Sequence, residues 1–472
     1  MKGRFFMKAV SVTAAAVFVS GCATVDRKQS IEQASQVVSQ ITPATIHYLS
    51  SEEERKTNDS QLQALLKNEI TQAQAVQILL MNSPSFQRLL ASSWREQAWA
   101  AQTGRIANPV LSFERVSTEH GLEIGRVLSF GLLELLTLPA KKNAAEQFIK
   151  ASNLTLTANV VEQVLAVQHA WIDAVLAQQK QAYAQKVLKA AEASSILAKR
   201  MQGAGNFTRS QAIRQQLFYS DSAINLANAK HDWVAKKEHL VRLLGLSSEY
   251  SQALKIPSAF PVLPKAPLTS TQVGKQGVDR LDIKLAQHQY AGQLERYGVD
   301  KVSSFIDIEL GLIREYERSE GGSESASGYE LEFKLPLFDW GDLKREAMQA
   351  NLQAAQSNLK VVLNASSSYL RQGYSAYRTA YDIAQHFRKE VEPMQQRLAE
   401  ENTYLYNGMF IGVFQLIQDN RNQVKVYENA MQAQANFWKS LANLNATIVG
   451  VPASGGVNLS VTSGGMTAGE DH

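Results

Sequence analysis

The chain of 472 residues contains a single cysteine, Cys22. One cysteine cannot build a disulfide framework or a cysteine-based metal site. The eight histidines are scattered, and no HExxH, CxxC or His/Asp ligand cluster is present, so we predict no resident metal and no cofactor. A P-loop, a dinucleotide fingerprint and a nucleophile paired with a base are also missing, and we therefore predict that the protein is not an enzyme.

Charge of one sign and long apolar runs are equally scarce. The net charge of +4 is small and evenly spread, which argues against a nucleic-acid partner. No run of 18 or more apolar residues follows the N-terminal segment, so we predict no transmembrane helix. A membrane-spanning role would then require a β-barrel.

The N-terminus has the pattern of a lipoprotein signal peptide over residues 1–21. Basic residues precede the apolar run Ala9–Val19, which is too short to span a membrane, and Ser20 and Gly21 stand before Cys22. This ending resembles the lipobox of bacterial lipoproteins, which implies cleavage before Cys22 and acylation of its thiol. Ala23, rather than Asp, would then favour the outer membrane. The alternative is an ordinary signal peptide with an incidental cysteine. The polar residues 22–60 are expected to form a lipid-anchored tether, extended with some helix.

Two segments in the second half, Phe305–Leu312 and Tyr329–Leu335, alternate apolar and charged residues in the way of strands. Such alternation predicts a sheet with one apolar face and one wet face. Residues 319–328, nearly all Ser, Gly and Glu, are expected to form the loop between them. The charged positions are expected to line the wet interior of a barrel: Asp307, Glu309, Glu330, Glu332 and Lys334.

A less regular hairpin is expected at about residues 108–138. Asn108-Pro109 opens it, a turn falls near residues 119–121, and Leu138-Pro139 ends it. Residues 131–136 are apolar enough to lie at a lipid interface.

Long helices follow, because residues 140–256 contain no proline and are rich in Ala, Gln, Leu and Lys. We predict two antiparallel helices, Ala140–Gln202 and Thr208–Leu244, within a helical hairpin over about 140–245. A helix of about 60 residues is roughly 90 Å long. The narrow apolar stripe suits coiled-coil packing.

The same order then repeats after a proline-rich linker at 257–267. The first repeat is expected at 61–256 and the second at 268–450, with its hairpin at about 303–336, its helical hairpin at about 342–449 and a flexible tail at 451–472. One chain supplies four strands with open edges, whereas three chains supply twelve, which can close. We therefore predict a mainly α fold with a small β part: a homotrimer in which a twelve-stranded β-barrel continues as a long α-helical barrel.

Three features together resemble the TolC-like outer-membrane efflux channels, over about residues 61–450. They are Asn108-Pro109 before the first strand, Leu335–Gly341 after the last, and the tip segments 204–207 and 406–413. The tips look like those of a subgroup often associated with heavy-metal, especially copper, export. The resemblance implies a homotrimer in the outer membrane with a periplasmic helical extension. It also implies a periplasmic adaptor and an inner-membrane pump, of the RND type or another, as partners. The cargo would be metal ions or drugs.

The tips supply the candidate functional residues. Those expected to dock the adaptor are Gly205, Asn206, Phe207, Gly408, Met409, Phe410 and Gly412, with Phe414 as a further exposed apolar contact. The alternative is that the glycines merely end helices and that the apolar side chains pack between helices. Asp419 and Arg421 would form charged rings at the narrow end if they face the lumen. Otherwise they belong to a solvated face or an interhelical ion pair. The second tip lacks the aspartate pair usual in the family.

Two other functions remain open at this point. A periplasmic adaptor also has a lipobox and long helices, but it carries one helical hairpin with a lipoyl-like β domain. A structural coiled-coil lipoprotein would have no pore.

Overall fold

The computed structural model describes residues 25–48, 52–119, 121–304, 307–319 and 322–452. The predicted signal peptide, Cys22 and residues 453–472 of the predicted tail lie outside the described residues. The elements, in chain order, are α2 (Arg27–Ile41), α3 (Glu52–Leu66), α4 (Gln72–Asn82), α5 (Pro84–Thr103), β1 (Val110–Thr118), β2 (Gly121–Gly131), α6 (Leu132–Gly203), α7 (Arg209–Leu244), α8 (Ser248–Ala253), α9 (Ser270–Gln276), α10 (Leu281–Ser303), β3 (Ile308–Ser319), β4 (Gly322–Phe333), α11 (Asp342–His386), the π-helical turn η1 (Phe387–Val391), α12 (Glu392–Asn407) and α13 (Val413–Ile448).

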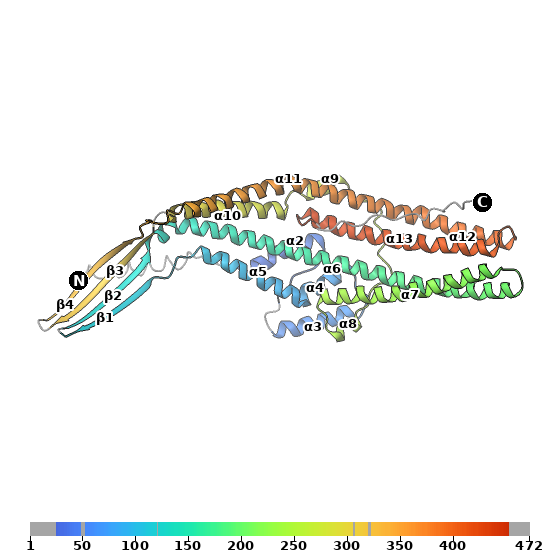
Figure 1. The fold of residues 1–472 in the computed structure, drawn as a ribbon, viewed down its shortest axis with the longest axis horizontal. Helices are drawn as coiled ribbons and strands as arrows, with labels where there is room; N and C mark the ends of the chain where they lie inside the picture. The colour runs from blue at the N-terminus through green and yellow to red at the C-terminus, as the bar shows by residue number, and fades with distance from the viewer. Residues whose placement is uncertain (1–24, 49–51, 120, 305–306, 320–321, 453–472) are drawn as a thin grey trace. The chain divides into compact units, whose positions relative to one another are not determined.

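The four strands form one antiparallel sheet in the order β1-β2-β3-β4 (Figure 1). β2 pairs with β3 along its whole length, from Gly121 opposite Ser319 to Gly131 opposite Glu309. This pairing joins the hairpin of the first half to the hairpin of the second. β1 and β4 are therefore the two edges of the sheet within one chain.

The second hairpin is longer than the alternation predicted. Residues 322–328, expected to be part of a loop, belong to β4 and pair with residues 313–319 of β3. Ser and Gly have low strand propensity, but a neighbouring strand that supplies hydrogen bonds and register overrides it. Asp307 and Lys334 flank the strands, and the Lys334 amide donates to the Asp307 carbonyl at 3.2 Å.

The first hairpin is shorter than predicted. β2 ends at Gly131, and residues 132–138, expected to continue the strand, form the start of α6. Pro139 lies inside the helix instead of ending the hairpin. A proline interrupts one backbone hydrogen bond of a helix, but the leucine-rich turns on its N-terminal side are good helix formers.

α6 continues for 72 residues, and α7 for 36. By length and composition α6 could cross a membrane, but 67% of its most apolar window is buried within the protein. That burial is typical of a core helix. In the second half, α11, η1 and α12 follow one another without a loop, so the expected single helix contains a π-helical turn. Pro393, in the first turn of α12, cannot donate the usual backbone bond and accounts for this irregularity.

The chain divides into two compact units. The first comprises the described parts of residues 1–30, 90–156 and 281–365, and it contains the sheet. Trp94 is buried in this unit, where its indole N–H donates to the Ser30 hydroxyl at 3.3 Å and the Arg27 guanidinium lies 5.1 Å from its ring centre. Gln147 of α6 and His288 of α10 are hydrogen-bonded at 2.7 Å.

The second unit comprises the described parts of residues 31–89, 157–280 and 366–472. Its core includes Tyr377 and Phe437, whose rings lie 5.9 Å apart. The proline-rich linker lies against α11, because the Leu268 amide donates to the Tyr377 hydroxyl at 3.0 Å and the Tyr381 hydroxyl donates to the Pro264 carbonyl at 3.1 Å. The predicted tether is largely helical where it is described, as α2 and the start of α3.

Gly245 ends α7 in a left-handed conformation with φ of +67°. A Cβ atom here would overlap with Pro84 Cδ and lie 2.9 Å from Ser83 Cα. The Asn82 side chain donates to the Gly245 carbonyl at 3.1 Å and fixes the turn. Both the backbone conformation and the close approach therefore require glycine.

We expect Gly245→Ala to lower the free energy of unfolding by about 2–4 kcal/mol, the sum of left-handed strain and overpacking. Urea denaturation of the detergent-solubilised protein measures it. Gly274→Ala is the matched control, since a Cβ atom at that position would have nothing within 4 Å and the φ of Gly274 is ordinary. That variant should be as stable as the parent or about 1 kcal/mol more stable. Equal stability of the two variants would contradict the argument.

Candidate functional site

The pairing register divides the charged residues of the sheet between its two faces. Paired residues in adjacent strands lie on the same face, and successive residues alternate. One face, here called the acidic face, carries all eight glutamates of the strands: Glu114, Glu123, Glu309, Glu315, Glu317, Glu324, Glu330 and Glu332. Within the four described strands it carries no Lys or Arg. This face therefore suits water and not lipid.

Three of these glutamates lie side by side across the sheet. Glu123 pairs with Glu317, and Glu317 pairs with Glu324. Directly opposed like charges destabilise a sheet unless water and counterions separate them. This row therefore strengthens the conclusion that the acidic face is wet.

The other face, here called the apolar–arginine face, carries the remaining charges. Its apolar residues are Leu111, Phe113, Leu122, Ile124, Leu128, Phe130, Ile308, Leu310, Leu312, Tyr316, Tyr329, Leu331 and Phe333, and its charged residues are Arg115, Arg126, Arg314 and Arg318. The exposed fractions are high for a single chain, 70% for Leu111 and 74% for Tyr329. Side chains of this kind need an apolar environment from outside the chain.

The glutamates predicted to line a barrel interior all lie on the acidic face. Glu309 pairs with Glu332, and Glu330 pairs with Gly311. The other two predicted residues, Asp307 and Lys334, lie one position beyond the strand ends. Their role in a barrel interior stays a prediction, because one chain supplies an open sheet.

The first helical tip is a glycine-containing turn between α6 and α7 (Figure 1). Gly205 has φ of +77°, its amide donates to Gln202 O at 3.0 Å, and the Asn206 amide donates to Met201 O at 2.9 Å. These two bonds form the Schellman motif that closes a helix C-terminus. α7 then starts at an N-cap, Thr208, whose capping box with Gln211 is complete.

The second tip, between α12 and α13, has the same motif. The Met409 amide donates to Tyr406 O at 3.0 Å and the Phe410 amide to Leu405 O at 2.8 Å. The left-handed residue is Met409, with φ of +60°, whereas Gly408 has φ of −77°. Gly408 instead provides room, because a Cβ there would lie 2.8 Å from the Phe410 ring.

The tips therefore match residue by residue, but not glycine to glycine. Gly205 corresponds to Met409, and Asn206 corresponds to Phe410. Three residues after the left-handed position, the N-cap is Thr208 in one tip and Gly412 in the other. An alignment from the sequence alone would match Gly205 with Gly408, one position before its true counterpart, Met409.

Two of the apolar side chains at the tips are exposed as expected, and one is not. Met409 and Phe410 are 92% and 80% exposed, as docking residues should be. Phe207 is buried, with an exposed fraction of 9%, and packs on Ala198 and Met201. The expectation that Phe207 is an exposed contact is thus wrong, because it fills the space between the helices at the turn. The side chain of Phe414 lies outside the described residues.

Asp419 and Arg421, near the start of α13, contact different neighbours. The side-chain Nδ2 of Asn402, in α12, donates to Asp419 Oδ2 at 2.9 Å, which holds the second helical hairpin together. Arg421 contacts α7 instead. Its guanidinium carbon lies 4.1 Å from the Phe218 ring centre, and Nη2 donates to the Arg214 carbonyl at 3.1 Å. Arg421 therefore joins the two helical hairpins of the chain.

Burial changes the pKa of both groups. It raises the pKa of the Asp419 carboxyl and lowers the pKa of the Arg421 guanidinium, the latter effect being partly offset by Asp221. Arg421 stays charged, since arginine is not deprotonated in proteins. Sequence reasoning missed its partners, because neither Phe218 nor Arg214 carries a recognisable signal.

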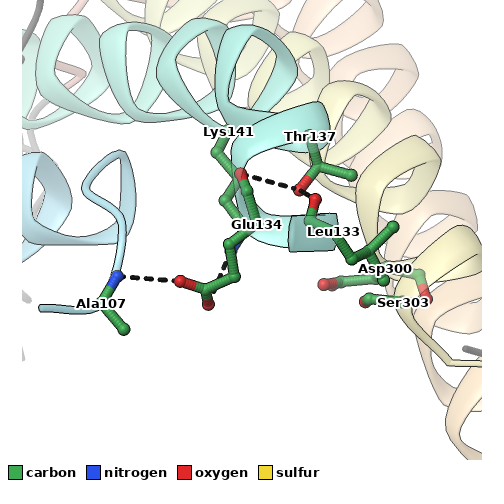
Figure 2. Close-up of polar contacts among 7 residues, drawn as sticks. All are labelled: Ala107, Leu133, Glu134, Thr137, Lys141, Asp300 and Ser303. Atoms are coloured by element: carbon green, nitrogen blue, oxygen red, sulfur yellow. Dashed lines mark hydrogen bonds and ion pairs between the residues drawn. The ribbon is translucent and has the colours of Figure 1, made fainter. Parts of the chain in front are cut away.

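A carboxylate fixes the junction between the sheet and α6 (Figure 2). Glu134 Oε2 accepts from the Ala107 amide, just before β1, at 2.8 Å, and Oε1 pairs with Lys141 Nζ at 3.2 Å. The Ala107 hydrogen bond, with help from Lys141, lowers the pKa of Glu134. The chain entering β1 is thereby tied to the helix that leaves β2.

Among the described residues, no group of three or more His, Cys, Asp or Glu side chains is arranged to hold a metal ion. What the arrangement offers is a pair of chemically opposite sheet faces and two helical tips.

Solved structures share this arrangement. The chain superposes on the outer-membrane channel OprN with a TM-score of 0.67 at 14% identity, over 91% of this chain and 97% of that one. The fold is that of an outer-membrane channel. The CmeC channel of Campylobacter jejuni matches this channel fold with a TM-score of 0.65 at 14% identity, over 89% and 91% of the two chains. CusC, described as forming a transmembrane channel, matches with 0.64 at 14% identity, over 82% and 94%.

The resemblance to the TolC-like channels is thus confirmed at the level of the channel fold. Neither a family model nor a curated protein matches the sequence.

We expect Glu134→Gln to lower the free energy of unfolding by about 1 kcal/mol at pH 7, a value reduced for the partial exposure of the pair. A group whose pKa is lowered by folding stabilises the protein above its unfolded pKa, and this contribution is lost as the pH falls through the folded pKa. The difference between parent and variant, measured by urea denaturation, should therefore be present at pH 7 and shrink as the pH falls from about 4.3, the ordinary pKa of Glu, through the lower pKa of Glu134 in the folded protein. Glu146→Gln, at an exposed position of the same helix, is the control. A difference independent of pH would count against the assignment.

Proposed function

We propose that the protein is the outer-membrane channel subunit of a tripartite efflux system. Three copies would pair β1 of one chain with β4 of the next and close a twelve-stranded barrel, continued by a helical barrel in the periplasm. The duct is passive, and solutes would be delivered by an inner-membrane pump, of the RND type or another, through a periplasmic adaptor. The cargo class, metal ions such as copper or drugs, stays open.

The division of charge across the sheet carries this proposal. An open sheet with eight glutamates on one face and exposed Leu, Phe and Tyr on the other is unfavourable both in water and in lipid. Water would contact the apolar side chains, and lipid would contact the glutamates. Closure places the acidic face around a water-filled lumen and the apolar–arginine face toward lipid. The unpaired edges of β1 and β4 are then used as well, since no open sheet edge is tolerated within a membrane.

The two other candidate functions fit this sheet poorly. A periplasmic adaptor has no use for two hairpins joined in one amphipathic sheet. A pore-less coiled-coil lipoprotein would leave the apolar–arginine face exposed. In the proposed assembly, acylation of Cys22 would add a lipid anchor on the same membrane.

The protein purified from outer membranes should run as a trimer in unheated SDS gels and give stepwise conductance in planar bilayers. A monomer without conductance would overturn the proposal. A monomer that conducts would overturn the proposed trimer but not the proposed channel function.

The contact of Arg421 with α7 supports a role in holding the helical tips closed. Loss of the cation–π contact and the hydrogen bond should weaken the link between the hairpins by about 1–2 kcal/mol. We expect Arg421→Ala to raise the single-channel conductance about twofold or more. The helical tips would then open more readily, and the narrow end of the channel would offer less resistance to ions.

Arg214→Ala is the matched control for Arg421→Ala. It removes one exposed positive charge from the neighbouring helix but keeps the carbonyl that Arg421 uses. Its conductance should equal that of the parent. An unchanged conductance in Arg421→Ala would place the gate elsewhere.

The exposed Met409 and Phe410 support adaptor docking at the second tip. The double variant Met409→Gly/Phe410→Ser removes both apolar side chains, and glycine relieves the left-handed strain at 409. We expect cells with this variant to be as sensitive to copper, silver and a drug panel as cells without the gene, while the trimer still assembles. Val262→Ser, at an exposed apolar position in the proline-rich linker and away from both tips, is the control and should keep resistance. Full resistance in the double variant would exclude docking through these side chains.

A further inference from the structure

The apolar–arginine face is divided into two zones along its strands. The zone next to the helices contains apolar residues and Tyr329: Ile308 beside Phe333, then Phe130, Leu310 and Leu331, then Leu111, Leu128, Leu312 and Tyr329. The arginines lie in the zone toward the hairpin turns. Arg126 and Arg314 are directly opposite each other across β2 and β3, and Arg115 and Arg318 lie still closer to the turns.

The four arginines have no anionic partner within the described strands. All of them are exposed, and every glutamate of the strands belongs to the acidic face. The described residues include no ion pair with any of the four. Two guanidinium groups directly opposite each other, as at Arg126 and Arg314, repel unless an anion lies between them. The arginine zone therefore suits the binding of an anion from outside the chain, at the border of an apolar surface.

The apolar zone covers part of the thickness of a lipid layer. Ile308 and Arg314 are six residues apart along β3, about 20 Å along the strand at roughly 3.4 Å per residue, or about 16 Å along the membrane normal for a strand tilted by about 40°. The segment after β4 extends the apolar surface on the helix side, since Leu337, Phe338 and Trp340 are 69%, 99% and 62% exposed. Aromatic residues at this end suit one membrane interface, and the arginines then lie near the other.

We propose that Arg115, Arg126, Arg314 and Arg318 bind the phosphate groups of outer-leaflet lipids around the barrel. Guanidinium groups bind phosphate through paired N–H donors, and their aliphatic stems lie along the apolar surface. Neighbouring protomers pair edge to edge and leave this face uncovered, so lipid is the occupant that reaches it. The inference rests on the proposed channel function, because only a closed barrel in a membrane gives this face a lipid layer.

The test uses the full-length protein in detergent and lipid A with two phosphates as the probe. Native mass spectrometry measures the lipid that stays bound to the trimer. We expect bound lipid A to fall at least about fivefold in the variant Arg115→Gln/Arg126→Gln/Arg314→Gln/Arg318→Gln, as charge-assisted contacts are lost. Lipid A with one phosphate should bind the parent more weakly, and inorganic phosphate should compete only at high concentration.

The control is Arg88→Gln/Arg397→Gln, which removes two exposed arginines from helices and should bind lipid A like the parent. If the fourfold variant does not assemble, Arg115→Gln/Arg318→Gln tests the zone near the turns, and its binding should fall at least about twofold. Undiminished binding by a variant that still conducts in bilayers would overturn this inference alone. A parent protein without conductance would overturn the proposed function and this inference with it.

Discussion

The antiparallel pairing of β2 with β3 is the interaction on which the structure depends. It joins two hairpins that are far apart in the chain, and its register decides which side chains share a face. A shift by one residue would place glutamates among the leucines of the neighbouring strand, so burial of one face in lipid and wetting of the other fix the register. The backbone hydrogen bonds and the division of charge are thus two results of one alignment.

The two halves of the chain have the same order of elements, a hairpin followed by long helices. Each half supplies a hairpin and a pair of helices that end in a Schellman turn, and α7 and α13 have equal lengths. The halves differ in detail, since α6 is continuous while α11, η1 and α12 include a π-helical turn. Arg421 then joins the two helical hairpins through its contacts with α7.

Much of the fold could be predicted from the sequence, because alternation at 308–312 and 329–333 and helix-forming composition are local signals. The length of β4 could not, since Ser323–Gly328 becomes a strand only through its neighbour. The start of α6 was predicted too late, after Pro139, because a proline usually marks the boundary of a helix. At the tips, glycine predicted the turn but not the left-handed position, which Met409 takes instead of Gly408. The partner of Arg421 is 207 residues away, a distance that no local pattern covers.

The one-position offset between the tips has a consequence for symmetry. In the proposed assembly of three chains, six turns would surround the periplasmic mouth and alternate in kind around it. Three would present a glycine and an asparagine, and three a methionine and a phenylalanine. A ring of six identical partner hairpins would then contact two different kinds of turn, one polar and one apolar. Three of the partner subunits would therefore bind more tightly than the other three.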